Sequence, residues 1–259
     1  PRRDRLVVEY NTSTNPTFRG RYSAVRDTSG MGNDGTMYGG MYYSPNGKYF
    51  DFDGSNDYID CELPQEFWGD PELTISMWVN PQTLANANGQ YDTFIHLGKN
   101  ASSSQIQLTY YGYSGGLQLG GYDQGMLTNN SSLIPIGQWT HLCAVIKPGA
   151  WGITTKKLYV NGRFQPTVLS GSGTTYLPIP ERYKSENHLD ARNGAYGSSR
   201  LVVGAVINSS GTTYNHHSDV RISQLKLYDT ALTDLEVNTL HNMGRCDEGH
   251  HMVNFSKTR

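Results

Sequence analysis

The segment from Tyr49 to Pro81 constrains the fold of this chain most strongly. Its two ends alternate apolar and polar residues with a period of two, which is the pattern of half-buried β-strands. Residues 53–57 (DGSND) between these ends are typical turn residues. The apolar residues of the alternation are Phe50, Phe52, Ile75, Met77 and Val79. The segment therefore predicts two strands of a β-sandwich, joined by a short turn-rich connection.

Three later segments extend the pattern. Residues 137–146 (GQWTHLCAVI) predict a strand buried on both faces, with Trp139 in the core. Residues 157–163 (KLYVNGR) predict its hairpin partner, which closes in an Asn-Gly turn. Residues 219–228 (DVRISQLKLY) alternate cleanly and predict a final strand.

A single short helix is predicted after this last strand. Thr233 and Glu236 have the spacing of a capping box, in which each side chain bonds the backbone N–H of the other. Gly244 is a typical C-terminal stop. The expected apolar face consists of Leu232, Leu235 and Leu240.

Five motifs occur in the order FDGSNDYI, TISMWVNP, GQWTHLCAVI, KLYVNG and DVRISQLKLYDTALTDLE. In this order they resemble the laminin-G-like and pentraxin-like branch of the concanavalin A-like lectin/glucanase superfamily, and residues 27–36 (DTSGMGNDGT) resemble its N-terminal segment. The resemblance implies an all-β fold: a two-sheet antiparallel jelly-roll sandwich with one short C-terminal helix. It covers residues 20–244, preceded by an N-terminal segment (1–19) packed on the domain and followed by a tail or linker (245–259).

Bulk properties exclude several function classes. A net charge of −2 and a pI near 6.5 argue against a nucleic-acid surface. No apolar run approaches the ~20 residues that a membrane-spanning helix needs, so we expect no membrane insertion. Three cysteines are too few for a disulfide framework. Cys143 is expected to be a buried hydrophobe, and the sequence leaves open whether Cys61 and Cys246 pair.

Enzymatic activity is not expected. The glucanases that share the implied fold carry two catalytic glutamates in a Glu-x-Asp-x-x-Glu arrangement, which this sequence lacks. Hydrolysis of a glycan is therefore the least favoured function.

Calcium is the one cofactor that the resemblance suggests, because many relatives hold a structural calcium ion with oxygen ligands. The candidate metal ligands are Asp27, Asp53 and Asp219. The alternative is that Asp27 and Asp53 only stabilise turns through their side chains. The adjacent His216 and His217 are interpreted as polar loop residues, since neighbours in a strand point to opposite faces.

The aromatic composition favours a binding site, because 18 Tyr and 4 Trp accompany only 7 Phe. Such rings stack on the flat faces of sugars while polar neighbours bind the hydroxyl groups. A Gly-rich segment and a loop before the last strand supply the candidate ligand-binding residues, which are Tyr110, Tyr113, Tyr122, Asp123, Gln124, Tyr214 and Asn215. Ordinary packing of tyrosines on half-buried strands is the alternative.

Together these features predict a non-catalytic module that recognises a glycan or a glycosylated surface. A structural or adhesion module that binds a protein partner is the competing hypothesis. The tail MGRCDEGHHMVNFSKTR resembles segments that follow such domains in surface proteins of large algal DNA viruses. The expected setting is a larger chain or assembly, either extracellular or on a virion surface.

Overall fold

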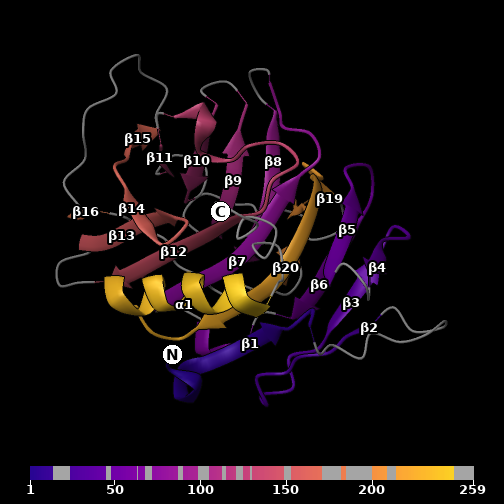
Figure 1. Cartoon of the computed structure of the whole chain (residues 1–259), viewed down its shortest axis with the longest axis horizontal. Coiled ribbons are helices and arrows are strands. Elements are labelled where there is room, and N and C mark those ends of the chain that lie inside the picture. Colours follow the sequence, from indigo (N-terminus) through magenta and orange to yellow (C-terminus); the bar gives the residue numbers. More distant parts are fainter. Residues whose placement is uncertain are drawn as a thin grey trace, which may run out of the picture.

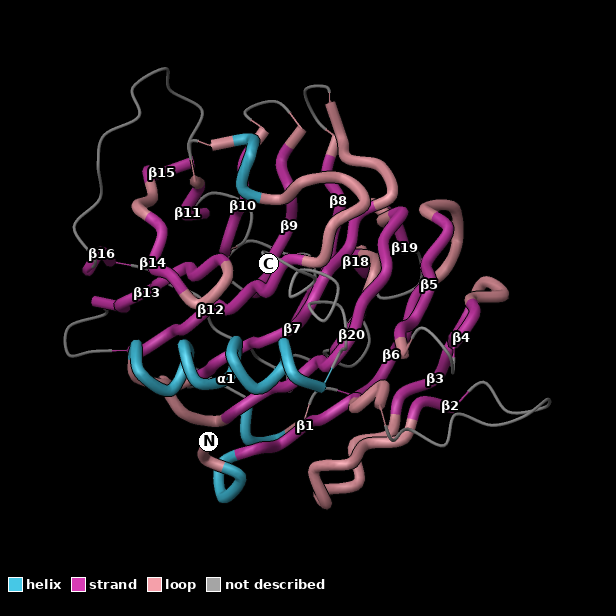
Figure 2. The backbone as a smooth tube through the Cα atoms, in the orientation of Figure 1, coloured by secondary structure: helices cyan, strands magenta, loops and turns pink. Residues whose placement is uncertain are grey.

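The computed structural model describes residues 1–13, 24–44, 48–62, 64–67, 72–86, 90–98, 105–112, 115–120, 125–128, 130–148, 153–170, 182–184, 200–208 and 214–247. Within these residues, two large antiparallel sheets pack face to face, and one helix lies across the outside of the first sheet (Figures 1 and 2). This arrangement confirms the predicted two-sheet antiparallel sandwich with one C-terminal helix.

The first sheet, called sheet A, has nine strands. In spatial order seven of them are β14 (Arg163–Gln165), β13 (Ile153–Val160), β12 (Thr140–Pro148), β7 (Leu73–Pro81), β20 (Asp219–Tyr228), β5 (Tyr49–Asp53) and β4 (Tyr42–Ser44). The other two pair at its sides, β1 (Leu6–Tyr10) with β20 and β16 (Arg182–Lys184) with β13.

The second sheet, sheet B, also has nine strands. Their spatial order is β15 (Val168–Ser170), β11 (Gly125–Leu127), β10 (Gly116–Leu119), β9 (Gln105–Tyr111), β8 (Tyr91–Gly98), β17 (Arg200–Val203), β6 (Tyr58–Glu62), β3 (Gly35–Tyr38) and β2 (Ala24–Val25). The remaining elements are the hairpin of β18 (Val206–Ile207) and β19 (Tyr214–Asn215), the 3-10 turns Arg3–Arg5, Gln65–Phe67 and Ser131–Leu133, and α1 (Asp234–Asp247).

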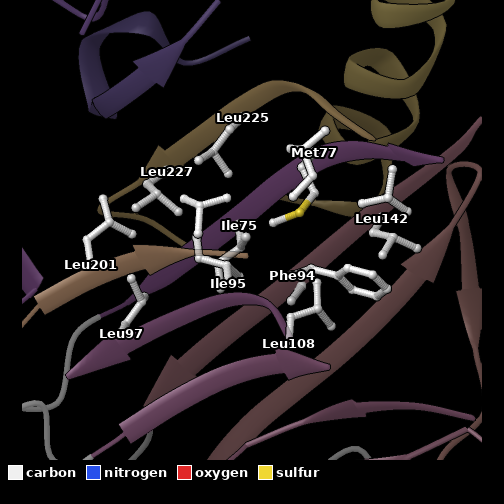
Figure 3. Close-up of a cluster of buried hydrophobic side chains, with 14 of the residues drawn as sticks. Ile75, Met77, Phe94, Ile95, Leu97, Leu108, Leu142, Leu201, Leu225 and Leu227 are labelled. Atoms are coloured by element: carbon white, nitrogen blue, oxygen red, sulfur yellow. The ribbon is translucent and has the colours of Figure 1, made fainter. Parts of the chain in front are cut away.

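The core lies between the two sheets, where side chains from both interdigitate (Figure 3). Ile75 and Met77 of β7 and Leu225 of β20 meet Phe94 of β8 and Leu108 of β9 in this layer. The alternating residues that predict the strands, Phe50, Phe52, Ile75, Met77 and Val79, are all buried. The period-two alternation therefore correctly predicted which residues of these strands are buried.

The outer face of sheet A is covered by α1, so its central strands are buried on both faces. Leu232, Val237 and Leu240 pack there in one cluster with Cys143 of β12 and Tyr159 of β13. Cys143 is thus the predicted buried hydrophobe. Cys61 is also buried and is a free thiol.

The start of α1 is confirmed as a capping box: the Thr233 N–H donates to Oε2 of Glu236 (2.8 Å), and the Glu236 N–H donates to Oγ1 of Thr233 (3.3 Å). Two other expectations for this helix are wrong. Leu235 is 77% exposed, and Val237 takes its place on the buried face. Gly244 does not end the helix, which continues to Asp247. Instead, Gly244 fits closely against the ring of Trp78.

Two details of the predicted hairpin also differ. β13 pairs with β12 as expected, but the Asn161-Gly162 turn joins β13 to β14. Both turn residues have positive φ (50° and 74°), as a tight two-residue hairpin requires. Trp139 precedes β12 and is only half-buried, with its ring 6.1 Å from that of Tyr49, so its assignment to the core is wrong.

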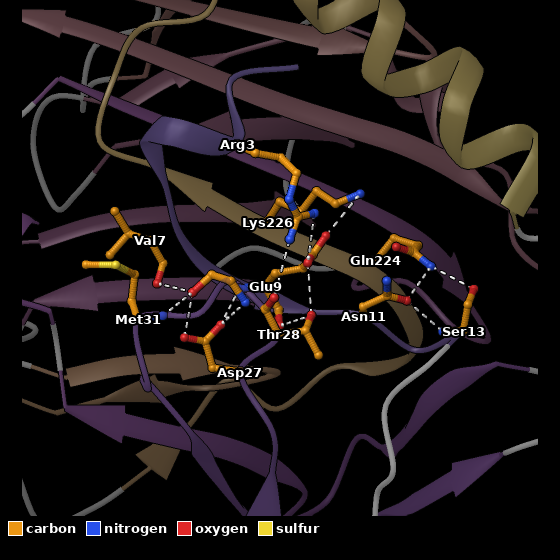
Figure 4. Close-up of polar contacts among 11 residues, drawn as sticks. Arg3, Val7, Glu9, Asn11, Ser13, Asp27, Thr28, Met31, Gln224 and Lys226 are labelled. Carbon is orange, nitrogen blue, oxygen red and sulfur yellow. Dashed lines mark hydrogen bonds and ion pairs between the residues drawn. The ribbon is translucent and has the colours of Figure 1, made fainter.

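The N-terminal strand β1 is held against β20 by buried charges (Figure 4). The carboxylate of Glu9 lies near Nζ of Lys226 (3.8 Å) and near a guanidinium nitrogen of Arg3 (3.5 Å), and it accepts a hydrogen bond from Thr28 (2.9 Å). Because burying a charge is costly unless it is paired, these contacts let Glu9 occupy the interior edge of sheet A.

In the described part of the chain, α1 is too short and too polar to cross a membrane.

Candidate functional site

One end of the sandwich is hollowed into a pocket of about 420 Å³. Its walls come from four regions that are distant in sequence: the end of β5, the β7–β8 connection, the start of β8, and the residues between β19 and β20. The described residues that line it are Asp53, Gly54, Thr83, Leu84, Ala85, Gln90, Tyr91, Asp92, His216, His217 and Asp219. Most of these side chains are polar.

Two carboxylates of this pocket stand on neighbouring strands of sheet A. Asp219 begins β20 and lies opposite Asp53 in the antiparallel pairing of β20 with β5. Oδ1 of Asp53 accepts hydrogen bonds from the backbone N–H groups of Ser55 (2.8 Å) and Asn56 (3.4 Å). Asp53 therefore shapes the turn that follows it, as the sequence allows for this residue, and it also lines the pocket.

A third carboxylate, Asp92, stands at the start of β8. Its Oδ2 accepts a hydrogen bond from the backbone N–H of Ala85, which fixes the β7–β8 connection against the strand. Burial raises the pKa of Asp92, and the charge of Asp219 raises it further.

Aromatic rings form one wall of the pocket. Tyr91 stacks on Tyr111 of the neighbouring strand β9, with ring centroids 4.9 Å apart and planes 16° from parallel. The ring of His216 makes a T-shaped contact with Tyr91, with ring centroids 5.2 Å apart and planes 78° apart. The Tyr91 ring is thus held by two neighbours, which lowers the entropy cost of presenting it to a ligand.

The two histidines are positioned by the small hairpin of β18 and β19. The ring of Tyr214 stacks on Tyr58 of β6, with centroids 3.9 Å apart, and its hydroxyl donates to Oδ2 of Asp60 (3.0 Å). Arg200 also pairs with both oxygens of Asp60, through Nε to Oδ1 at 2.7 Å and through a second nitrogen to Oδ2. These contacts anchor the hairpin on sheet B directly before His216.

His217 closes the wall on the side of β6. Its Nδ1 donates to the carbonyl of Asp57 (3.2 Å), and its ring lies 6.1 Å from that of Tyr58. The other face of Tyr58 stacks on Tyr38 of β3 at 4.8 Å. The rings of His217, Tyr58 and Tyr38 therefore follow one another from the pocket to Tyr38, which is 42% exposed.

The predicted metal ligands do not converge on one ion. Asp27 lies beside β1, where its two carboxylate oxygens accept bonds from the backbone N–H groups of Glu9, Ser29 and Asn33 and from the Ser29 hydroxyl. This is the turn-stabilising role. Nowhere in the described ranges do three or more His, Cys, Asp or Glu side chains form a group that could hold a metal ion. The set of three aspartates thus does not fit a single calcium site, and only Asp53 and Asp219 come together.

The predicted ligand-binding residues fare unevenly. Tyr110 is buried in the core at 6% exposure, so its ring is no stacking surface for a ligand. Four more, Tyr113, Tyr122, Asp123 and Gln124, lie outside the described residues. Tyr214 and Asn215 do not line the pocket, but they immediately precede the two histidines that do.

Sequence reasoning missed the pocket residues Tyr91, Asp92 and His216 as parts of a site, and it interpreted His217 only as a polar loop residue. No local pattern marks them, because each needs partners from another segment. The one available signal was the position of His216 and His217 between Tyr214 and Asp219, two residues that the sequence had already singled out for binding.

Comparison with known proteins bears on the fold. A family model described as "Concanavalin A-like lectin/glucanases superfamily" matches residues 53–238 of the chain. No curated protein sequence matches it.

Several solved structures are similar in fold. Domain 4 of AbnA, an extracellular arabinanase from Geobacillus stearothermophilus in complex with arabinotriose, is 21% identical with a TM-score of 0.59, over 92% of this chain and 98% of that one. The botulinum neurotoxin serotype D binding domain is 14% identical (TM-score 0.58), and the match covers 93% of this chain but only 52% of that one. A Trypanosoma rangeli sialidase is 16% identical (TM-score 0.59), with 94% of this chain and 33% of that chain covered. This chain therefore corresponds to about half of the toxin domain and a third of the sialidase.

Proposed function

Since the chain belongs to the concanavalin A-like lectin/glucanase superfamily, we propose that it is a non-catalytic carbohydrate-binding domain with its sugar site in the pocket between Tyr91 and Asp219. The observation that carries the proposal is the combination of a fixed aromatic wall with three carboxylates and an amide in one cavity. A sugar ring offers an apolar C–H face to Tyr91 and a rim of hydroxyls to Asp53, Asp219 and Gln90.

Binding is favoured over hydrolysis by the way the carboxylates are used. Glycosidases need one carboxyl group free to donate a proton and a second one free to attack or to activate water. Here Asp92 is bonded to the backbone of Ala85 and Asp53 to the turn amides of Ser55 and Asn56. Of the three carboxylates, only Asp219 has both oxygens without a hydrogen bond from a described residue.

The proposed setting is an extracellular surface or a virion surface, as a module of a larger chain. The neighbours support the coarser part of this idea, since they are a domain of an extracellular enzyme and a toxin binding domain. The viral setting rests on the resemblance of the tail alone. The competing function is adhesion to a protein partner.

A glycan array tests the proposal. We expect the wild-type domain to retain a restricted set of glycans and to release them intact, and Asp219→Asn to retain them more weakly. Glu66→Gln is the matched control, since Glu66 is exposed and does not line the pocket. Binding only to proteins, or cleavage of the retained glycans, would overturn the proposal.

A further inference from the structure

The pocket carries an excess of negative charge that its own walls do not neutralise. Among its described lining residues, three are aspartates and none is Lys or Arg. The adjoining segments 87–89 (ANG) and 209–213 (SSGTT) also contain no charged residue. None of the ion pairs in the described ranges includes Asp53, Asp92 or Asp219.

Two carboxylates near the pocket are paired with arginines, whereas the buried Asp57 forms no ion pair with a described residue. Asp51, two residues before Asp53, pairs with Arg221 (3.2 Å), and Asp60 pairs with Arg200. Arg221 belongs to β20, which begins with the pocket residue Asp219, and Arg200 belongs to β17, yet neither guanidinium lines the pocket. Asp51 and Asp60, outside the cavity, thus have guanidinium partners, whereas the three aspartates that line it have none among the described residues.

Asp92 gives the strongest indication of a missing positive partner. This residue is only 9% exposed and lines the pocket, and its Oδ2 alone accepts a hydrogen bond among the described groups. Its Oδ1 accepts no hydrogen bond from a described residue. A largely buried carboxylate with a like charge nearby is costly, and a cation in the pocket would offset that cost.

Building on the proposed function, we infer that the pocket selects sugars that carry a protonated amine, that is, 2-amino sugars, over neutral sugars, and that it rejects acidic ones. An ammonium group in the pocket would be attracted by the three aspartates and would donate charge-assisted hydrogen bonds to the nearest of them. The face of Tyr91, braced by Tyr111, would support both the C–H face of the ring and the cation. An acidic sugar would meet the same three carboxylates and be repelled.

Calorimetric titration with three trisaccharides tests this inference: a glucosamine trimer, its N-acetylated form of the same length and linkage, and trigalacturonate. At slightly acidic pH we expect the glucosamine trimer to bind about tenfold more tightly than the acetylated form, which equals 1.4 kcal/mol. Added salt should weaken only the first, and trigalacturonate should not bind. Asp219→Asn should reduce the preference for the amine, whereas Glu66→Gln should keep it.

Other results would overturn the inference. Equal or tighter binding of the acetylated trimer would do so while leaving a carbohydrate-binding function intact. Binding of trigalacturonate would also overturn the inference. The same holds if none of the three trisaccharides binds while the array identifies another, neutral glycan. Repeating the titration with added calcium tests whether the pocket binds a metal ion instead. If calcium abolishes the amine preference at constant ionic strength, the pocket is a calcium site and the inference is wrong. Failure of every glycan on the array would overturn both proposals.

Discussion

Gly244 of α1 lies directly against the indole of Trp78 in β7, so closely that a Cβ at this position would overlap Nε1 of the ring. Trp78 itself is buried at 2% exposure, and His241, one turn earlier in the helix, stacks on its ring at 5.5 Å. The helix is therefore fitted to the outer face of sheet A by a residue without a side chain.

We expect Gly244→Ala to lower the free energy of unfolding by about 1–3 kcal/mol, because overpacking outweighs the better helix propensity of alanine. Chemical denaturation measures this. Met243→Ala is the control, since Met243 is the adjacent residue and is half-exposed. A Gly244→Ala protein as stable as the wild type would contradict the close fit.

Trp78→Ala and Trp139→Ala should differ strongly in stability. Trp78 fills the space under α1, so its truncation should cost about 3–5 kcal/mol. Trp139 is half-buried before β12 and should cost clearly less. Thermal and chemical denaturation of both variants decide the point, and an equal loss would return Trp139 to the core.

Two buried histidines should make the domain sensitive to acid. Burial lowers the pKa of His96 to about 4 and that of His141 to about 3, from 6.5 in an unfolded chain. As the pH falls below 6.5, the unfolded state takes up protons that the folded state excludes, so stability is lost progressively down to about pH 4 for His96. His96→Gln should make the melting temperature depend less steeply on pH over this window. An unchanged slope would show that His96 is not held neutral.

Asp92→Asn should trade binding for stability. The raised pKa of Asp92 means that its ionised form costs folding energy at neutral pH, and that this cost disappears as the pH falls through the folded pKa. An asparagine can still accept the bond from Ala85 through its side-chain oxygen. We expect a higher melting temperature than the wild type at neutral pH, a difference that closes in acid, and weaker glycan binding. A variant that melts earlier at neutral pH would mean that the negative charge itself supports the fold.

The sequence predicted those parts of the fold that depend on local patterns. Phe50 and Phe52 alternate with polar residues and are buried, and Thr233 caps α1 as its spacing indicates. Trp139 was misplaced because the apolar pattern does not show that the strand begins one residue later, at Thr140. Gly244 was misread because the sequence does not distinguish a glycine that ends a helix from one that packs against an aromatic ring.

The site was largely beyond such patterns. Asp53 and Asp219 could be singled out as oxygen donors, and the structure pairs them. Tyr91 and Asp92 gain their role only when β8 is brought beside the segment of His216, more than 120 residues later in the chain. Contacts of this range come from the sheet order, which no short motif contains.

The structure of the domain with an array-selected glycan bound tests the central claim most directly. The account predicts a sugar ring stacked on Tyr91, with its polar groups within hydrogen-bond distance of Asp92 and Asp219. A glycan seated elsewhere, such as on the Gly-rich residues 112–125 or on the exposed ring of Tyr38 alone, with the pocket free of sugar, would contradict it.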